Sequence, residues 1–398
     1  MKLKLLLFLQ LIIYGCFSQP RMGYWLHSNV IRIPFEVVNN SLFIKVNLNK
    51  HKNLSFIVDT GSTYSVVFTD SLLSLPVQNK VISILGFGNT DSLTAHIAID
   101  NLVKISGFVT RGKQLLVIPK NKIGLQQFYD RPIHGVIGLD LLRQFDTEIN
   151  FRSNKLVLRK NGAKTKNNPR WKKVPFHLTE NAIIIPTTLK TTSRTEPIYL
   201  ILDTGSELPL LLQEKFCPDN SIPTIIGMGI LGYASGRIGL IPGIKIGELE
   251  MNGIATAFPD SASSKWNRNL PQQGNLGIQF LKKHRTIISY SQGLLQLKPI
   301  RRLTHSPYQY NRSGIAIEVV QNKGCDFFIS EIAPDSPAEK AGLLKGDQIV
   351  FVDRIPCTLL TLQKISERIF TSETNNLEIT VLRESIIKHV QLDLEKSL

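Results

Sequence analysis

Two aspartates of this chain stand in the same local context. Asp59 lies in FIVDTGS and Asp203 in LILDTGS, so each follows three apolar residues and precedes Thr-Gly-Ser. Such apolar runs predict buried strands, where an unpaired carboxylate is costly. Two carboxylates that meet cannot both ionise cheaply, so they share one proton. The ionised member can then deprotonate a water while the neutral member hydrogen-bonds to a carbonyl under attack, which predicts hydrolysis of a peptide bond without metal or cofactor.

The three residues after each aspartate suit this chemistry. The threonines can hydrogen-bond across an axis between the two loops, and the glycines allow a tight turn whose N–H groups approach the carboxylates. The serine hydroxyls can donate to the outer carboxylate oxygens. These predicted supporting residues are Thr60, Gly61, Ser62, Thr204, Gly205 and Ser206.

An internal repeat explains why the motif occurs twice. Three blocks recur in the same order at offsets of 141, 144 and 139 residues, which is the size of a domain. If two copies of one fold pack about a pseudo-twofold axis, equivalent loops meet there, so Asp59 and Asp203 come face to face. One chain then suffices for the site. The matched blocks are 33–46 with 174–187, 56–62 with 200–206, and 134–160 with 273–299.

The elements that must position the site are mainly strands. Short runs of Val, Ile, Leu and Phe alternate with Asn, Gly, Asp and Ser, and helix is predicted only around 139–144 and 278–283 in the two copies. We expect one lobe over residues 19–165 and a second over 166–300. The pattern then changes, and residues 301–398 predict an appended α+β domain with one helix after Leu359 and two closing strands.

The aspartate motifs and two further segments resemble the aspartic proteases of the retropepsin and pepsin type. The segments are Val136-Ile137-Gly138 and Asn275-Leu276-Gly277, which match the apolar-apolar-glycine strand beneath each catalytic loop, although Asn275 departs from the apolar preference. The resemblance covers about residues 30–300. It implies two β-barrel lobes with Asp59 and Asp203 as catalytic residues, in a bacterial single-chain relative that needs no dimer.

Members of that family close a glycine-bearing hairpin over the substrate, and this chain has a candidate in each lobe. Residues 82–91 and 225–236 each lie about 25 residues after an aspartate. Glycines at a hairpin tip suit a lid that must open for a polymer and then exclude water, although ordinary hairpin turns are the alternative. The candidate flap residues are Gly86, Phe87, Gly88, Gly227, Met228 and Gly229.

The appended domain carries the stretch APDSPAEKAGLLKGDQIVFVDRIP at 333–356, which resembles the signature of a PDZ domain of the permuted kind found in bacterial envelope proteases. The resemblance implies that backbone N–H groups of Ser313, Gly314 and Ile315 hold a peptide's C-terminal carboxylate while the peptide pairs with the strand 315–319. The alternative is a module that only packs on the protease.

The N-terminus predicts export. Two lysines, an apolar run and small residues are typical of a signal peptide cleaved after Ser18, giving a leader over residues 1–18. A lipoprotein with acylated Cys16 is the alternative. No later segment offers an apolar run long enough to span a membrane. Cys217, Cys325 and Cys357 fit no metal or redox spacing and are expected to be separate thiols.

The formal charge of +16 raises the alternative of a nucleic-acid binder. The positive residues are scattered, however, and the densest run, 159–173, is typical of a solvated connector. We therefore expect polypeptide substrates, no nucleic-acid partner and a periplasmic, envelope or secreted location. The predicted function is an exported aspartic endopeptidase. The alternative is a catalytically inactive envelope scaffold that binds peptides.

Overall fold

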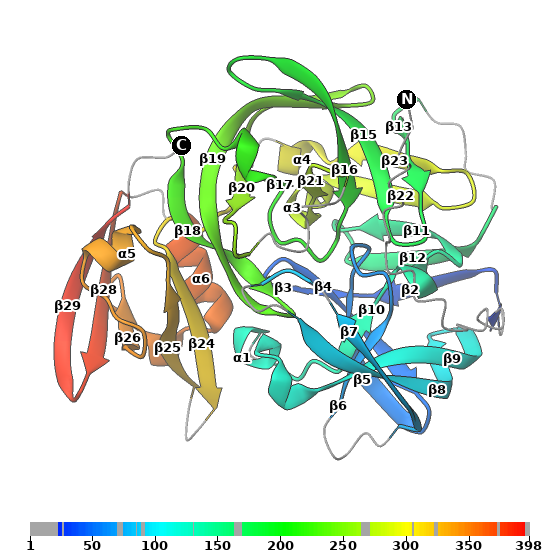
Figure 1. Cartoon of the computed structure of the whole chain (residues 1–398), viewed down its shortest axis with the longest axis horizontal. Helices are drawn as coiled ribbons and strands as arrows, with labels where there is room; N and C mark the ends of the chain where they lie inside the picture. The colour runs from blue at the N-terminus through cyan, green and yellow to red at the C-terminus, as the bar shows by residue number, and fades with distance from the viewer. Residues whose placement is uncertain are drawn as a thin grey trace, which may run out of the picture.

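The structure is a computed structural model. It describes residues 23–25, 28–69, 75–84, 86–88, 92–129, 131–162, 169–263, 271–304, 306–321, 325–371 and 375–394. The leader predicted over residues 1–18 lies outside these residues. Figure 1 shows two β lobes packed together, with a smaller domain beside them that holds the last strands of the chain.

The first lobe is a closed β-barrel. Strands β5, β4, β8, β9, β6 and β10 hydrogen-bond in a ring, which closes because β8 pairs with both β4 and β9. Helix α2 (Leu139–Leu142) follows β10, where the sequence predicts a helix. The strands are β1 (Tyr24–Trp25), β3 (Glu36–Val38), β4 (Ser41–Leu48), β5 (His51–Val58), β6 (Val66–Thr69), β7 (Val77–Ile84), β8 (Leu93–Ile105), β9 (Phe108–Pro119) and β10 (Gly135–Ile137).

The second lobe repeats this barrel. Strands β16, β15, β19, β20, β17 and β21 form the equivalent ring, closed by the pairing of β15 with β19. Helix α3 (Ile278–Lys282) follows β21 as α2 follows β10, which confirms the second predicted helix. The strands are β14 (His177–Leu178), β15 (Ile183–Lys190), β16 (Thr195–Leu202), β17 (Leu210–Leu212), β18 (Ile222–Gly229), β19 (Gly232–Ile246), β20 (Leu249–Pro259) and β21 (Gly274–Leu276).

A six-stranded sheet joins the lobes in the order β13-β23-β22-β11-β12-β2. Its central pair, β11 with β22, is antiparallel and places Glu148 opposite Ile287. These two residues are 139 positions apart, which is the repeat offset of this block. The pseudo-twofold axis therefore passes between them. The strands are β2 (Val30–Pro34), β11 (Phe145–Asn150), β12 (Lys155–Lys160), β13 (Lys172–Pro175), β22 (His284–Ser289) and β23 (Leu294–Pro299).

The last domain is a separate sheet in the order β24-β25-β26-β28-β29, with β27 paired to β26. Ser336 caps α5 (Pro337–Lys340), because its hydroxyl accepts a bond from the Glu339 N–H. Helix α6 (Leu362–Thr371) lies where helical spacing predicts it. The strands are β24 (Ile315–Gln321), β25 (Cys325–Ile332), β26 (Gln348–Val352), β27 (Ile355–Pro356), β28 (Asn376–Arg383) and β29 (Ile386–Asp393).

Short helical segments that the sequence analysis missed connect the strands. Helix α1 lies between β9 and β10 and contacts β24 of the last domain. It is too short for a helical period to show in the sequence. The remaining segments are η1 (Lys120–Lys122), α1 (Leu125–Tyr129), η2 (Glu214–Phe216), α4 (Arg301–Thr304) and η3 (Cys357–Leu359).

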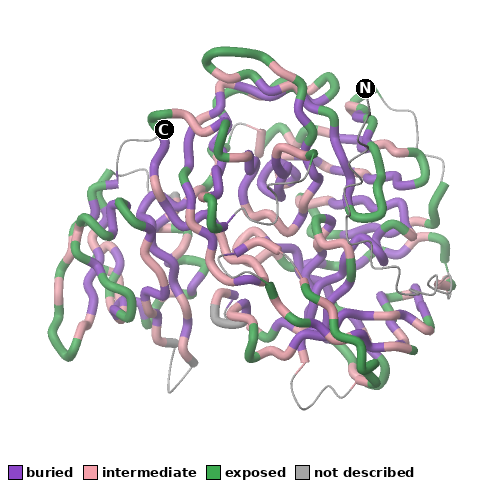
Figure 2. The backbone as a smooth tube through the Cα atoms, viewed as in Figure 1, coloured by how far each residue is buried: buried purple, intermediate pink, exposed green. Residues whose placement is uncertain are grey.

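One hydrophobic core runs through both lobes and the sheet between them, and a second core fills the last domain. Leu139 and Ile278, the first residues of the repeated helices, are both fully buried in the shared core. Figure 2 shows the buried stretches concentrated in the strands of both lobes, with exposure at the outer turns. Burial of each such side chain contributes about 1.5–3 kcal/mol, so the two lobes are expected to be stable as one unit.

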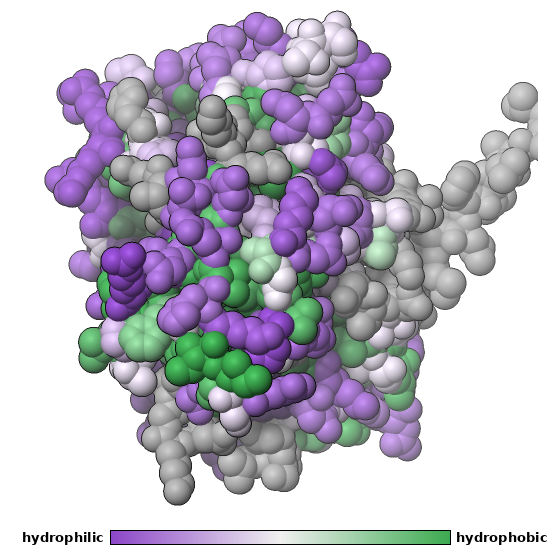
Figure 3. Space-filling model, turned by 90° about the vertical axis from the view of Figure 1, so that its left-hand side faces the viewer, coloured by the Kyte–Doolittle hydropathy of each residue, from purple (hydrophilic) through white to green (hydrophobic). Residues whose placement is uncertain are grey.

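The outer surface is mixed in character. Figure 3, which views the molecule from the side of the last domain, shows mainly hydrophilic side chains with small hydrophobic patches between them. Among the described residues, no helix has the length and apolar character that crossing a membrane requires. Cys217 and Cys357 carry free thiols, as expected for those two residues.

Candidate active site

Asp59 and Asp203 follow the last residues of β5 and β16, at equivalent points of the two barrels. Each backbone N–H is held by the strand that passes beneath the loop, since Asp59 N donates to Ile137 O and Asp203 N donates to Leu276 O, both at 3.0 Å. These strands are the segments that suggested the family resemblance. The repeat therefore places both aspartates on rigid supports.

The two carboxyl groups face each other across the axis, since Gly61 lies against the carboxyl group of Asp203 and Gly205 against that of Asp59. The turn after each aspartate adds two backbone donors to one oxygen, as predicted. Gly61 N and Ser62 N lie 2.8 and 3.2 Å from Asp59 Oδ1. In the second lobe, Gly205 N and Ser206 N lie 2.9 and 3.1 Å from Asp203 Oδ1. These backbone donors hold both carboxyl groups in fixed orientations.

The predicted role of the serine hydroxyl is wrong for Ser62. Its hydroxyl donates to Tyr64 O at 2.9 Å, whereas its backbone N–H is the group that reaches Asp59. The reason is the tight turn, which points main-chain N–H groups inwards and directs this side chain along the loop.

Thr60 and Thr204 lock the two loops together across the axis, as predicted. Thr60 N donates to Thr204 Oγ1 at 3.0 Å, and Thr204 N donates to Thr60 Oγ1 at 3.1 Å. Each hydroxyl then donates into the other lobe, to Leu202 O at 2.7 Å and to Val58 O at 2.8 Å. Both side chains are buried, so this reciprocal network fixes the separation of the aspartates.

Glycine is required at Gly61 and Gly205 because each faces the aspartate of the other lobe. A Cβ at Gly61 would lie 2.5 Å from Asp203 Cγ, and one at Gly205 would lie 2.5 Å from Asp59 Cγ. No real Cβ tolerates such distances, so any side chain there would push the two carboxyl groups apart.

The dyad is asymmetric because of Asn275, which the sequence analysis regarded as a departure from the family pattern. Its Nδ2 donates to Asp203 Oδ2 at 2.5 Å, whereas the equivalent first-lobe residue is Val136 and has no such group. Burial raises the pKa of Asp59 well above its usual range, and the charge of Asp203 raises it further. Burial also raises the pKa of Asp203, but bonds from Asp59 and Asn275 oppose this. The Asn275 amide therefore favours the ionised form of Asp203 over that of Asp59.

Replacement of Asn275 by valine, its repeat counterpart, is expected to move the acidic limb of the activity profile upwards by about one pH unit. Loss of the donor raises the pKa of Asp203, so the ionised dyad forms only at higher pH. The measurement is kcat/KM against pH for one peptide. Val136→Ala, which alters the same strand position in the other lobe, should leave that limb in place. An unmoved limb in Asn275→Val would contradict this role.

A cavity of about 440 Å³ lies over the dyad between the lobes. It is lined mostly by apolar side chains, and both predicted flaps form part of its wall. Gly86, Phe87 and Gly88 lie at the connection between β7 and β8, and Gly227, Met228 and Gly229 lie at the end of β18 before its turn into β19. The site is therefore a cavity with both flaps in its wall and a mostly apolar lining, of the kind that suits an extended polypeptide.

The two flap tips meet above the channel. Leu231 N donates to Phe87 O at 3.2 Å, and a Cβ at Gly229 would lie 1.9 Å from that same oxygen. Phe87 packs against the apolar cluster of the second lobe, whereas Met228 and Ile230 pack against that of the first. Each predicted flap is thus held by the opposite lobe.

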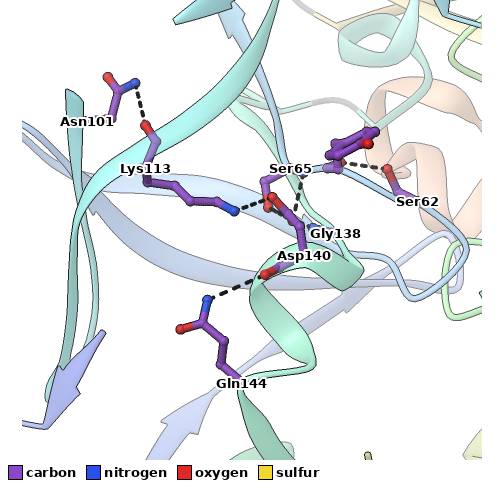
Figure 4. A network of polar contacts seen from close by, with 8 residues as sticks. Ser62, Ser65, Asn101, Lys113, Gly138, Asp140 and Gln144 are labelled. Carbon is purple, nitrogen blue, oxygen red and sulfur yellow. Dashed lines mark hydrogen bonds and ion pairs between the residues drawn. The ribbon is translucent and has the colours of Figure 1, made fainter. Parts of the chain in front are cut away.

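Two polar residues that the sequence analysis missed clamp the segments after the catalytic loops. Asp140 in α2 accepts bonds from Ser65 N and Ser65 Oγ, and its other oxygen pairs with Lys113 at 2.5 Å (Figure 4). Gln279 occupies the equivalent place in α3, where its Nε2 donates to Glu207 O at 3.0 Å. Asp140 and Gln279 occupy equivalent positions of the repeated blocks 134–160 and 273–299. The repeat is thus the sequence feature from which their similar roles could have been predicted.

The last domain adjoins the stalk of the second flap. Thr224 Oγ1 on β18 donates to Asn311 O at 2.8 Å, and Ser330 Oγ on β25 donates to Tyr233 OH on β19 at 2.8 Å. Ile225 packs with Ala316 and Ala333 in a small apolar cluster. The stalk of this flap and the last domain are therefore joined by hydrogen bonds and by apolar packing.

The predicted carboxylate-binding N–H groups already have partners. Ser313 N and Gly314 N donate to Asn311 Oδ1 at 3.1 and 3.0 Å, and Ile315 N donates to Ser313 Oγ at 3.2 Å. A peptide carboxylate would have to displace the Asn311 side chain to reach them. Asn311 Nδ2 also donates to Ile225 O, at 3.3 Å, so this side chain joins the predicted peptide loop to the flap stalk.

The family model of the PDZ domain matches residues 328–383, so the C-terminal region is a PDZ domain. No curated protein matches the chain. The crystal structure of aspartic proteinase from Irpex lacteus is similar over 69% of this chain and 99% of that one, at 13% identity and a TM-score of 0.45. That of Basic 7S globulin from soybean is similar over 68% and 95%, at 10% identity and a TM-score of 0.43.

The chain thus combines two six-stranded β-barrels that repeat one topology with a C-terminal PDZ domain. The functional assignment depends on the geometry of the site.

Proposed function

We propose that this chain is an aspartic endopeptidase whose two lobes supply one catalytic carboxyl group each. The observation that carries the proposal is the pairing of Asp59 with Asp203 at the base of an apolar cavity between the lobes. The backbone donors to the two carboxyl groups match, and Asn275 adds a donor to Asp203 alone. A structural aspartate that caps its own turn needs no partner from another lobe.

The proposed mechanism gives each aspartate a separate task. The Asp203 carboxylate removes a proton from a bound water, whose oxygen attacks the substrate carbonyl carbon, while the Asp59 carboxyl donates its proton to the carbonyl oxygen. In the gem-diol step Asp203 passes the proton it took from water to the amide nitrogen, and Asp59 regains a proton from one gem-diol hydroxyl as the C–N bond breaks, so the dyad returns to its starting state. The products are a new carboxyl group and a new amine, and no covalent intermediate forms.

The PDZ domain is proposed to regulate access to the channel. Its contacts with the β18–β19 stalk support this role, because a shift of the domain would move the second flap. Recruitment of a substrate's C-terminus remains a proposal as well, and it requires displacement of Asn311. Export to the cell envelope or beyond, inferred from residues 1–18, completes the proposed function.

The test is incubation of the purified mature chain with a denatured protein from pH 3 to pH 8, with new termini identified by mass spectrometry. Cleavage that pepstatin blocks supports the proposal. Absence of cleavage at every pH would overturn it and favour the inactive scaffold. Steeply salt-dependent retention on DNA would instead indicate a nucleic-acid binder.

A further inference from the structure

A third carboxylate, Glu207, lies on the wall of the channel. It follows Asp203 by four residues and lines both the catalytic cavity and a second cavity, which β24 and α6 of the PDZ domain border. Leu208, Ile226 and Gly227 also line both cavities. Glu207 therefore lies where the cavity over the dyad adjoins the cavity beside the PDZ domain.

The side chain of Glu207 has a neutral partner. Tyr129 OH donates to Glu207 Oε1 at 3.3 Å, and that hydroxyl also lies 2.8 Å from Ser41 Oγ. Within the described part of the chain, no lysine or arginine forms an ion pair with Glu207. Burial raises the pKa of Glu207 to about 8, which reflects a carboxyl group with no cation at hand.

The two lobes carry different residues at the position of Glu207. The first-lobe equivalent of Glu207 is Thr63, whose hydroxyl donates to Asn181 O at 3.3 Å. A carboxylate thus faces only one half of the channel, the half next to the PDZ domain. Any charge recognition by Glu207 would act on one side of the scissile bond.

We infer that Glu207 forms a subsite for a basic side chain, so that the enzyme prefers polypeptides with lysine or arginine on one side of the cleaved bond. The inference rests on the proposed function. A lysine or arginine in this apolar channel needs an anion, and Glu207 needs a cation, so each supplies the partner that the other lacks. Elsewhere the channel presents mainly apolar walls that suit neutral side chains.

The first test is the cleavage profile of the wild-type chain on a peptide library. Lysine and arginine should be enriched at one position, on one side of the scissile bond. Cleavage without basic enrichment at any position would overturn the inference and leave the proposed function standing. Absence of all cleavage would overturn the proposed function itself.

The second test compares two peptides that differ only by lysine or norleucine at the enriched position. Glu207→Gln should lower the ratio of their kcat/KM values by about 10- to 100-fold, because it removes the charge but retains an acceptor for Tyr129. Tyr129→Phe removes the hydroxyl and retains the carboxylate, so the ratio should stay at or above that of the wild type. Equal loss on both peptides in Glu207→Gln would indicate a purely structural role and contradict the subsite.

Discussion

Replacement of Asp59 or Asp203 by asparagine is expected to abolish peptide hydrolysis, with a loss of at least about 10³-fold in kcat. Asparagine has the shape of aspartate and can accept the same bonds from the two following N–H groups, but it can neither take a proton from water nor give one to a carbonyl. The loss should be equally severe at either position because the two residues act as one unit. Retained peptidase activity in either variant would contradict the mechanism.

The same substitution at Asp59 is expected to stabilise the fold at neutral pH. Its carboxyl group has a raised pKa in the folded protein, because of burial and then the charge of Asp203. Above the ordinary aspartate pKa of 3.8 the carboxyl group ionises in the unfolded chain but stays neutral in the folded protein. The wild type therefore loses stability as the pH rises from 3.8 to the raised pKa of folded Asp59. Asp59→Asn removes that penalty.

The thermal midpoint is the measurement for this effect. At pH 7 the midpoint of Asp59→Asn should equal or exceed that of the wild type, and the difference should vanish below about pH 3.8, where both forms are neutral. A lower midpoint at pH 7 would show that the ionised carboxylate stabilises the fold. If Asp59→Asn is inactive but at least as stable as the wild type, its loss of activity is not caused by loss of the fold.

Loss of the Lys113–Asp140 pair is the second large effect. Both side chains are under 10% exposed, and Asp140 also holds Ser65 at the end of the first catalytic loop. Lys113→Met leaves the Asp140 carboxylate buried without its cation, which should cost about 3–5 kcal/mol of the free energy of unfolding. Urea denaturation monitored by fluorescence measures this cost.

A double variant shows whether Lys113→Met destabilises the fold through an unpaired buried charge or through lost packing. Addition of Asp140→Asn to Lys113→Met removes the uncompensated charge and retains an oxygen for Ser65, so the double variant should be more stable than Lys113→Met alone. Additive losses would contradict this. Lys172→Met serves as the matched control because Lys172 and Glu248 are an exposed pair, and its effect should stay within about 0.5 kcal/mol.

The sequence predicted the architecture because the fold is duplicated. The three offsets align the two barrels and both short helices. The structure adds that Glu148 pairs with Ile287, its repeat counterpart, on the axis. The offsets also required Asp59 and Asp203 to meet, since equivalent loops of two packed copies must face each other. A single Asp-Thr-Gly would not have carried that prediction.

The residues that differ between the two lobes could not be predicted from the repeat. Asn275 departs from the apolar pattern, and only its position beneath the loop shows that it donates to Asp203. Glu207 and Asn311 line a cavity to which both lobes and the PDZ domain contribute, and Asn311 also bonds to the second lobe. These contacts join residues far apart in the sequence, so no local sequence pattern predicts them. The direction of the Ser62 hydroxyl depends on turn geometry rather than on residue type.

The most direct test of the central claim is hydrolysis of one peptide in ¹⁸O-labelled water by the purified mature chain. The account predicts cleavage in which one ¹⁸O atom enters the new carboxyl group during a single turnover, with no peptide-linked protein at any time. It also predicts loss of the product in both aspartate variants. A covalent adduct, or product formation by Asp59→Asn or Asp203→Asn, would contradict a water activated between the two aspartates.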